Sequence, residues 1–154
     1  MSPTAQAVVD AIDIGEVEEA TGIEGLIPDP GLYGAGLHCI PPGGFLNMHC
    51  DFNQHPNGWH RRVNLLLYLN EQWEDAWNGH LVLSEDGNPK GKSIAPKGGR
   101  CVVFETNNQS WHGHPPPLAC PDHIQRRSLA LYYYTPEPPE DQAHSTIYIK
   151  EKKK

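Results

Sequence analysis

A histidine and an aspartate separated by one residue, His49 and Asp51, stand at the end of an apolar stretch of the sequence. If that stretch is a β-strand, side chains two positions apart point to the same face. His49 and Asp51 could then reach one metal ion from one side. The triplet alone is weak evidence, because this spacing often occurs by chance. A metal site therefore needs a further ligand from elsewhere in the chain.

A second histidine, His112, follows the apolar stretch CVVFE in the sequence SWHGHP. Two histidines and one carboxylate on one side of a metal leave positions open for a co-substrate and oxygen. This is the facial arrangement of non-haem Fe(II) sites. His114 is the alternative to His112 as the second histidine, and the spacing alone leaves both open.

The apolar sequence RRSLALYYYT begins with two arginines, Arg126 and Arg127. A keto-acid co-substrate needs a cation for its far carboxylate, and a guanidinium makes a two-point contact with a carboxylate. On a strand, Arg126 shares its face with Ser128, Ala130 and Tyr132, whereas Arg127 shares the other face with leucines. A diacid fits beside small or polar neighbours. We therefore predict that Arg126 faces the pocket, with Arg127 as the alternative.

The elements that must position these residues are short strands. Glycine and proline number 15 each and fall between apolar segments, as in all-β proteins with many turns. This pattern predicts a sandwich, a jelly roll or a small barrel in one domain, residues 1–154, with a core over about 20–150. A short helix is expected over 7–20, broken at Gly15. The predicted strands are 37–40, 45–49, 63–70, 80–85, 92–95, 100–106, 110–113, 127–134 and 146–150.

The composition excludes several classes of function. With 12 Lys and Arg against 19 Asp and Glu the net charge is −7, so a nucleic-acid partner is not expected. No apolar run is long enough to span a membrane, and the N-terminus does not look like a secretory signal. The four cysteines lack C-x-x-C spacing and predict reduced thiols in a cytoplasmic protein.

Taken together, five sequence elements occur in an order that resembles the Fe(II)- and 2-oxoglutarate-dependent dioxygenases, in particular the prolyl 4-hydroxylase-like branch. They are the H-x-D triplet, RRVNLLLYLN, the G-x-L of the next segment, the H-G of SWHGHP, and the R-x-S of the final strand. The resemblance covers roughly residues 20–148. It implies a double-stranded β-helix, or jelly roll, that is mainly β with a few short helices.

The resemblance also implies roles for individual residues. His49 and Asp51 match the H-x-D iron ligands, and His112 matches the distal ligand because glycine follows it. Arg126 matches the basic residue that binds the 5-carboxylate of 2-oxoglutarate. The last two matches are Tyr68 in LLLYLN, which corresponds to a tyrosine that hydrogen-bonds the same carboxylate, and Ser128, which completes R-x-S.

The sequence departs from the family pattern in three places. The usual G-G-x-L reads NGHL over 78–81, which we expect to alter a turn and not the metal site. A tyrosine common on the strand before H-x-D is absent from LHCI, so His38 or Ile40 could take its place. Relatives carry more chain in front, so we expect a more open site.

The activity implied by the resemblance is hydroxylation of an unactivated C–H bond, with O2 as a substrate and succinate and CO2 as products. Fe(II) and 2-oxoglutarate are the implied cofactors, with ascorbate as a further candidate. The prime substrate is a polypeptide proline, a free amino acid or another small molecule. The alternatives are a cupin-like metal enzyme that does not use oxoglutarate and an inactive metal-binding jelly-roll module.

His55 and His60 are expected in an exposed loop.

Overall fold

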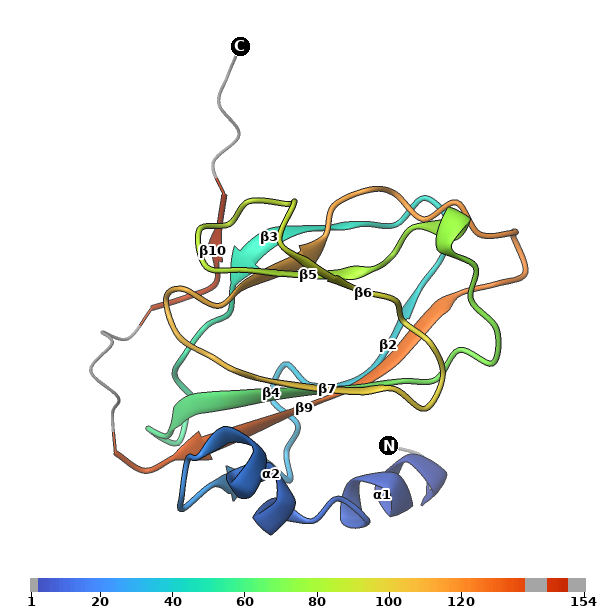
Figure 1. Cartoon of the computed structure of the whole chain (residues 1–154). Coiled ribbons are helices and arrows are strands. Elements are labelled where there is room, and N and C mark those ends of the chain that lie inside the picture. The colour runs from blue at the N-terminus through green and yellow to red at the C-terminus, as the bar shows by residue number, and fades with distance from the viewer. Residues whose placement is uncertain (1–2, 138–143, 150–154) are drawn as a thin grey trace.

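The computed structural model describes residues 3–137 and 144–149. Within them, short strands make two antiparallel sheets of five strands each, which lie one above the other, and two helices pack below the lower sheet (Figure 1). The elements are α1 (Pro3–Asp10), α2 (Ile14–Thr21), β1 (Ile27–Pro28), β2 (Gly36–Ile40), β3 (Leu46–Cys50), β4 (His60–Tyr68), the 3-10 helix η1 (Asp75–Trp77), β5 (Leu81–Ser84), β6 (Lys92–Ile94), β7 (Cys101–Glu105), β8 (Trp111–His114), β9 (Arg126–Thr135) and β10 (Ile147–Tyr148).

The two sheets have distinct strand orders. Sheet A runs β1-β9-β4-β7, with β2 also paired to β9, and sheet B runs β10-β3-β8-β5-β6. Many neighbours in these sheets are far apart in the chain, as expected when a strand pair folds over to form two layers. The prediction of a mainly β jelly roll with few helices is confirmed. None of the helices in the described ranges is long and apolar enough to cross a membrane.

The predicted elements agree with the observed ones to within a few residues, with one exception. The helix predicted over 7–20 is broken as expected, but the break at Gly15 was wrong in position, because α1 ends at Asp10 and α2 begins at Ile14. Asp13 causes the break by capping α2, since its carboxylate accepts a hydrogen bond from the backbone N–H of Gly15. Gly15 therefore lies in the first turn of α2 and is not the breaking residue. Lys150, the end of the last predicted strand, lies outside the described residues.

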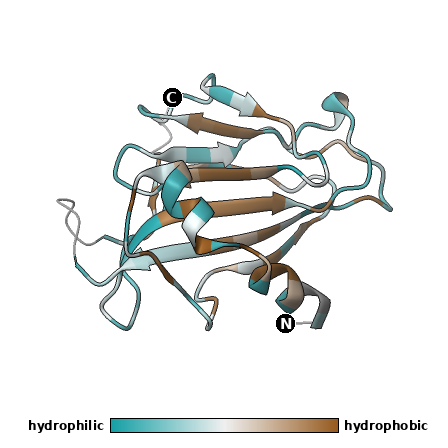
Figure 2. Cartoon of the chain, turned by 60° about the horizontal axis from the view of Figure 1, so that its bottom comes forward, coloured by the Kyte–Doolittle hydropathy of each residue, from teal (hydrophilic) through white to brown (hydrophobic). Residues whose placement is uncertain are grey.

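The main hydrophobic core lies between sheet A and the two helices. In Figure 2 the helices lie in front of the strands, and parts of both are coloured as hydrophobic. The alternate residues of β4 and β9 that point this way are apolar, as the strand parity predicted. With two residues from the N-terminal region they form one buried cluster: Val17, Leu26, Val63, Leu65, Leu129, Leu131 and Tyr133. The opposite face of sheet A is thereby left for the space between the sheets.

The contribution of this core can be measured at Leu129, whose side chain is 1% exposed. Leu129→Ala is expected to lower the free energy of unfolding by about 2–5 kcal/mol, because it removes buried methyl groups and leaves a cavity. Urea unfolding followed by circular dichroism measures the change. Leu37→Ala is the matched control, since Leu37 is 52% exposed. A loss at Leu37 equal to that at Leu129 would contradict the assignment of the core.

Candidate metal centre and its cavity

Two strands of sheet B and the residue after one of them bring three potential metal ligands together. His49 on β3 pairs in register with His112 on β8, and Asp51 directly follows β3. All three side chains are buried. One donor atom from each lies within 4.8 Å of the others, so a single cation could contact all three. The grouping that the sequence predicted is therefore present.

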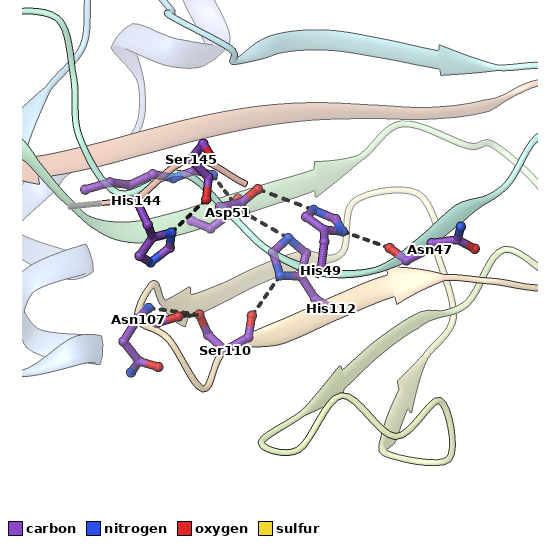
Figure 3. Close-up of polar contacts among 10 residues, drawn as sticks. Asn47, His49, Asp51, Asn107, Ser110, His112, His144 and Ser145 are labelled. Atoms are coloured by element: carbon purple, nitrogen blue, oxygen red, sulfur yellow. Dashed lines mark hydrogen bonds and ion pairs between the residues drawn. The ribbon is translucent and has the colours of Figure 1, made fainter. Parts of the chain in front are cut away.

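The backbone orients both imidazole rings toward Asp51. His49 Nδ1 lies 2.9 Å from the carbonyl oxygen of Asn47, and His112 Nδ1 lies 3.0 Å from that of Ser110. Because a carbonyl only accepts hydrogen bonds, each Nδ1 must carry the proton. Each Nε2 then faces Asp51, at 3.3 Å from Oδ1 for His49 and 3.2 Å from Oδ2 for His112 (Figure 3).

This arrangement fits a divalent metal ion. If the rings are neutral, two nitrogen lone pairs and a carboxylate face one another, and they repel unless a proton or a cation lies between them. Histidines fixed through Nδ1 by a carbonyl, with Nε2 free, are the usual arrangement of metal-binding imidazoles. Two imidazoles and one carboxylate are also a donor set suited to Fe(II).

The carboxylate of Asp51 is held by side chains from sheet A. Its Oδ2 accepts hydrogen bonds from Arg61 Nη2 at 2.8 Å and from Asn64 Nδ2 at 3.2 Å. Burial alone would raise the pKa of the Asp51 carboxyl. Hydrogen bonds from His112 and His49, which require a proton on each Nε2 while no cation is bound, together with the charge of Arg61 outweigh burial and hold that pKa well below its usual value. Asp51 is thus kept ionised, as a metal ligand must be.

A cavity of about 530 Å³ opens beside these three residues and lies between the sheets. Its walls are the inward faces of β2, β3, β4, β8 and β9. Both candidates for the place of the missing tyrosine, His38 and Ile40, line it. The other lining residues include Leu46, Asn64, Leu66, Leu81, His114, Arg126, Ser128, Ala130 and Tyr132. Carbon atoms therefore form much of the wall, with polar groups at few places.

Arg126 is a buried cation at one end of this cavity. Its Nε donates to the carbonyl oxygen of Gly79 at 2.8 Å, and its Nη2 lies 3.4 Å from the hydroxyl of Tyr68. Burial lowers the pKa of Arg126 and raises that of Tyr68. No carboxylate pairs with Arg126 among the ion pairs of the described residues. An anion that enters the cavity could therefore pair with the Arg126 guanidinium.

The predicted strand parity is confirmed on β9. Arg126, Ser128, Ala130 and Tyr132 all line the cavity. Arg127 is exposed, and its backbone N–H donates to Asn70 Oδ1. At the departure NGHL, Asn78 and Gly79 both adopt positive φ, at 62° and 75°. The carbonyl of Gly79, the glycine that this turn shares with the usual motif, accepts the hydrogen bond from Arg126 Nε.

Sequence reasoning missed other contacts near the site. Arg61 is the first residue of the RRVNLLLYLN element, but no role was predicted for it from the sequence, and the structure shows it fully buried against Asp51. The expectation that His55 is exposed was wrong, because its Nε2 lies 3.3 Å from Asp29 Oδ2 and its ring stacks on Trp59. His60 lies at the start of β4 and is half-buried. Asp29 lies in the loop before β2, and an acidic residue there was the signal that could have suggested a buried partner for His55.

His114 lies two residues beyond His112 but is not part of the three-residue cluster. Its ring is almost completely buried, and neither nitrogen has a hydrogen-bond partner within the described part of the chain. Burial, with the charge of Arg126, lowers the pKa of His114 to about 3. The imidazole is therefore neutral in the folded protein at neutral pH.

This shift predicts a pH-dependent stability. Below about pH 6.5 the unfolded chain binds a proton at His114 that the folded chain does not, so stability falls as the pH falls from 6.5 toward 3. The loss from this group is at most about 1.4 kcal/mol per pH unit. In metal-free protein, His114→Phe should reduce the slope of unfolding free energy against pH between 6.5 and 4. An unchanged slope in His114→Phe would contradict the prediction.

Comparisons with known proteins agree with the geometry. A family model described as the 2OG-Fe(II) oxygenase superfamily matches residues 35–134. Among solved structures, the chain is similar to a prolyl-4-hydroxylase from Pseudomonas putida, with 24% identity and a TM-score of 0.48. That match covers 64% of this chain and 48% of the other, so the chain spans about half the length of the solved relative. No curated protein matches the chain.

Proposed function

This chain belongs to the 2OG-Fe(II) oxygenase superfamily, and from that membership we propose that it is an Fe(II)- and 2-oxoglutarate-dependent dioxygenase. The proposed reaction is hydroxylation of an unactivated C–H bond, with release of succinate and CO2. The observation that carries the proposal is the buried group of His49, Asp51 and His112 beside a cavity that also contains Arg126.

In the proposed mechanism, His49, Asp51 and His112 hold the Fe(II) ion. When bound, iron would activate O2 with two electrons supplied by the oxidation of 2-oxoglutarate to succinate and CO2, so that oxygen can attack a C–H bond. Arg126 binds the far carboxylate of 2-oxoglutarate with a charge-assisted hydrogen bond. Tyr68 fixes the guanidinium through the 3.4 Å contact between its hydroxyl and Nη2.

The remaining cavity residues define the space that the co-substrate occupies. Ser128 is the second polar group on the Arg126 face of β9, and we propose that it assists in binding the same carboxylate. Ala130 leaves room for a five-carbon diacid on that face. Leu66 and Leu81 provide apolar walls, which exclude water and strengthen the electrostatic contacts inside.

For the prime substrate we propose a prolyl residue in a polypeptide, by analogy with the prolyl 4-hydroxylase-like branch. Phe45 supports this choice, because it lines the cavity while 55% of it stays exposed, so a chain entering there meets an apolar surface. We place the protein in the cytoplasm. The four cysteines form no disulfide in the described structure, which suits a reducing compartment.

The test is release of succinate from 2-oxoglutarate by protein loaded with Fe(II), with ascorbate present and O2 supplied. A slow release without prime substrate is expected, and a chelator or removal of O2 should stop it. Proline-containing peptides should then accelerate release more than free proline does. Acceleration by free amino acids alone would favour a small-molecule hydroxylase. No succinate under any condition would favour an inactive metal-binding module or an enzyme that does not use oxoglutarate.

A further inference from the structure

Arg61 has the most buried charged group near the candidate metal centre, yet it is not one of the ligands. It lies on β4, and its exposed fraction is 0%. Its Nη2 donates to Asp51 Oδ2 at 2.8 Å. Removing a guanidinium completely from water costs stability unless its partners compensate for the lost hydration. The contact with Asp51 is therefore expected to have a specific role.

Two aromatic rings contact the Arg61 guanidinium. Its Cζ lies 3.3 Å from the centroid of the Tyr132 ring and 4.9 Å from that of Phe52. Nε and Nη1 have no hydrogen-bond partner among the described residues. A group that only joined strands together would be expected to use most of its five donors. The ion pair that Arg61 makes within the described residues goes to the carboxylate of Asp51.

The same carboxylate oxygen receives a second donor from the same strand. Asn64 Nδ2 lies 3.2 Å from Asp51 Oδ2. Both donors belong to sheet A, whereas His49 and His112 belong to sheet B. Asp51 follows β3 in a segment with no regular secondary structure, so its backbone alone does not fix the side-chain torsions. The direction in which the carboxylate points is set from the opposite sheet.

We infer that Arg61 is a positioning residue that holds Asp51 in the orientation required for metal binding. The inference rests on the proposed function, since it assigns a role toward the same metal. Within the described residues, Arg61 does not line the cavity, and its ion pair is with Asp51 and not with the two histidines. It acts through Asp51, in the way that outer partners of metal ligands orient them and raise metal affinity.

The test is a titration of metal-free protein with Mn(II), followed by calorimetry at one fixed pH. Arg61→Met keeps an unbranched side chain as far as the position of Nε and removes the guanidinium that donates to Asp51. We expect it to weaken Mn(II) binding by about 10- to 100-fold. Arg62→Met is the matched control, because Arg62 is the next residue, is partly exposed and pairs with Glu105 at 3.8 Å. We expect Arg62→Met to bind Mn(II) like the wild type.

The conservative variant Arg61→Lys separates position from charge. It keeps the positive charge but lacks the planar group that lies over the Tyr132 ring, so we expect an intermediate affinity. The visible absorption spectrum of the Co(II)-loaded protein, which reports the geometry around the metal, should change in both Arg61 variants and not in Arg62→Met. If the role of Arg61 were only to repel the cation, Arg61→Met would bind Mn(II) more tightly.

Unchanged or tighter Mn(II) binding by a folded Arg61→Met variant overturns the inference. If circular dichroism shows that Arg61→Met does not fold, Arg61→Lys and Asn64→Ala decide the question. Each should weaken binding by several-fold, and wild-type affinity in both overturns the inference. Wild-type protein that binds Mn(II) but releases no succinate would contradict the proposed function and leave the role of Arg61 intact. Wild-type protein that binds no metal overturns both.

Discussion

Replacing His112 with alanine is expected to abolish turnover and to weaken Fe(II) or Mn(II) binding by more than about 100-fold, beyond the usual loss for an outer partner of a ligand. The structural reason is that the Nε2 of His112 lies 3.2 Å from Asp51 Oδ2, in the group of three donors. Its loss leaves one histidine and one carboxylate. Succinate release and calorimetric titration of metal-free protein measure the two effects.

His114→Ala is the matched control for this experiment. It removes the same type of side chain, two residues away on the same strand, from a ring that is not in the three-residue cluster. We expect His114→Ala to keep wild-type metal affinity to within a few-fold. If His114→Ala lost the metal and His112→Ala kept it, the choice between the two histidines would be wrong. Metal coordination by a cysteine, seen spectroscopically, would also contradict the assignment.

Arg126→Ala is expected to raise the concentration of 2-oxoglutarate needed for half-maximal succinate release by about 10- to 100-fold. A hydrogen bond to a charged group contributes about 1.5–3 kcal/mol, and each 1.4 kcal/mol corresponds to a factor of ten. Metal affinity without co-substrate should change little, because Arg126 contacts Gly79 and Tyr68 and not the three proposed ligands. The measurements are the dependence of rate on 2-oxoglutarate and a separate Mn(II) titration.

Two further variants make the Arg126 result specific. Arg127→Ala removes the same side chain from the exposed position next to it and should leave the 2-oxoglutarate requirement unchanged. Tyr68→Phe removes the hydroxyl that contacts Nη2 and should raise the requirement by less than Arg126→Ala does. A harmful Arg127→Ala together with a neutral Arg126→Ala would show that the co-substrate binds elsewhere.

The sequence was sufficient to predict which residues face the space between the sheets. On β9 the small and polar residues alternate with leucines, and the period of two in a strand converts that alternation into two faces. The same argument worked for β4, where Asn64 and Leu66 line the cavity and Val63 and Leu65 join the core. These predictions needed only local geometry, because a strand's own residues determine its two faces.

The contacts that could not be predicted from the sequence depend on the path of segments without regular secondary structure. Arg61 reaches Asp51 because the chain turns back after Asp51, so that the backbone N–H of Arg61 donates to the carbonyl of Asn53. No periodicity describes such a turn. Likewise His55 is buried because the segment before β2 brings Asp29 to it. In both cases the partner lies on another segment, and only the three-dimensional fold shows which one it is.

The division of labour between the sheets has a mechanical consequence. The histidines facing the proposed metal belong to one layer, whereas Arg126 and Tyr68 belong to the other. A metal and a diacid bound together would link sheet A to sheet B through contacts inside the cavity. Molecules that bind only the folded state stabilise it by mass action. The supply of iron and 2-oxoglutarate would then govern not only how fast the protein works but also how long each copy survives proteolysis.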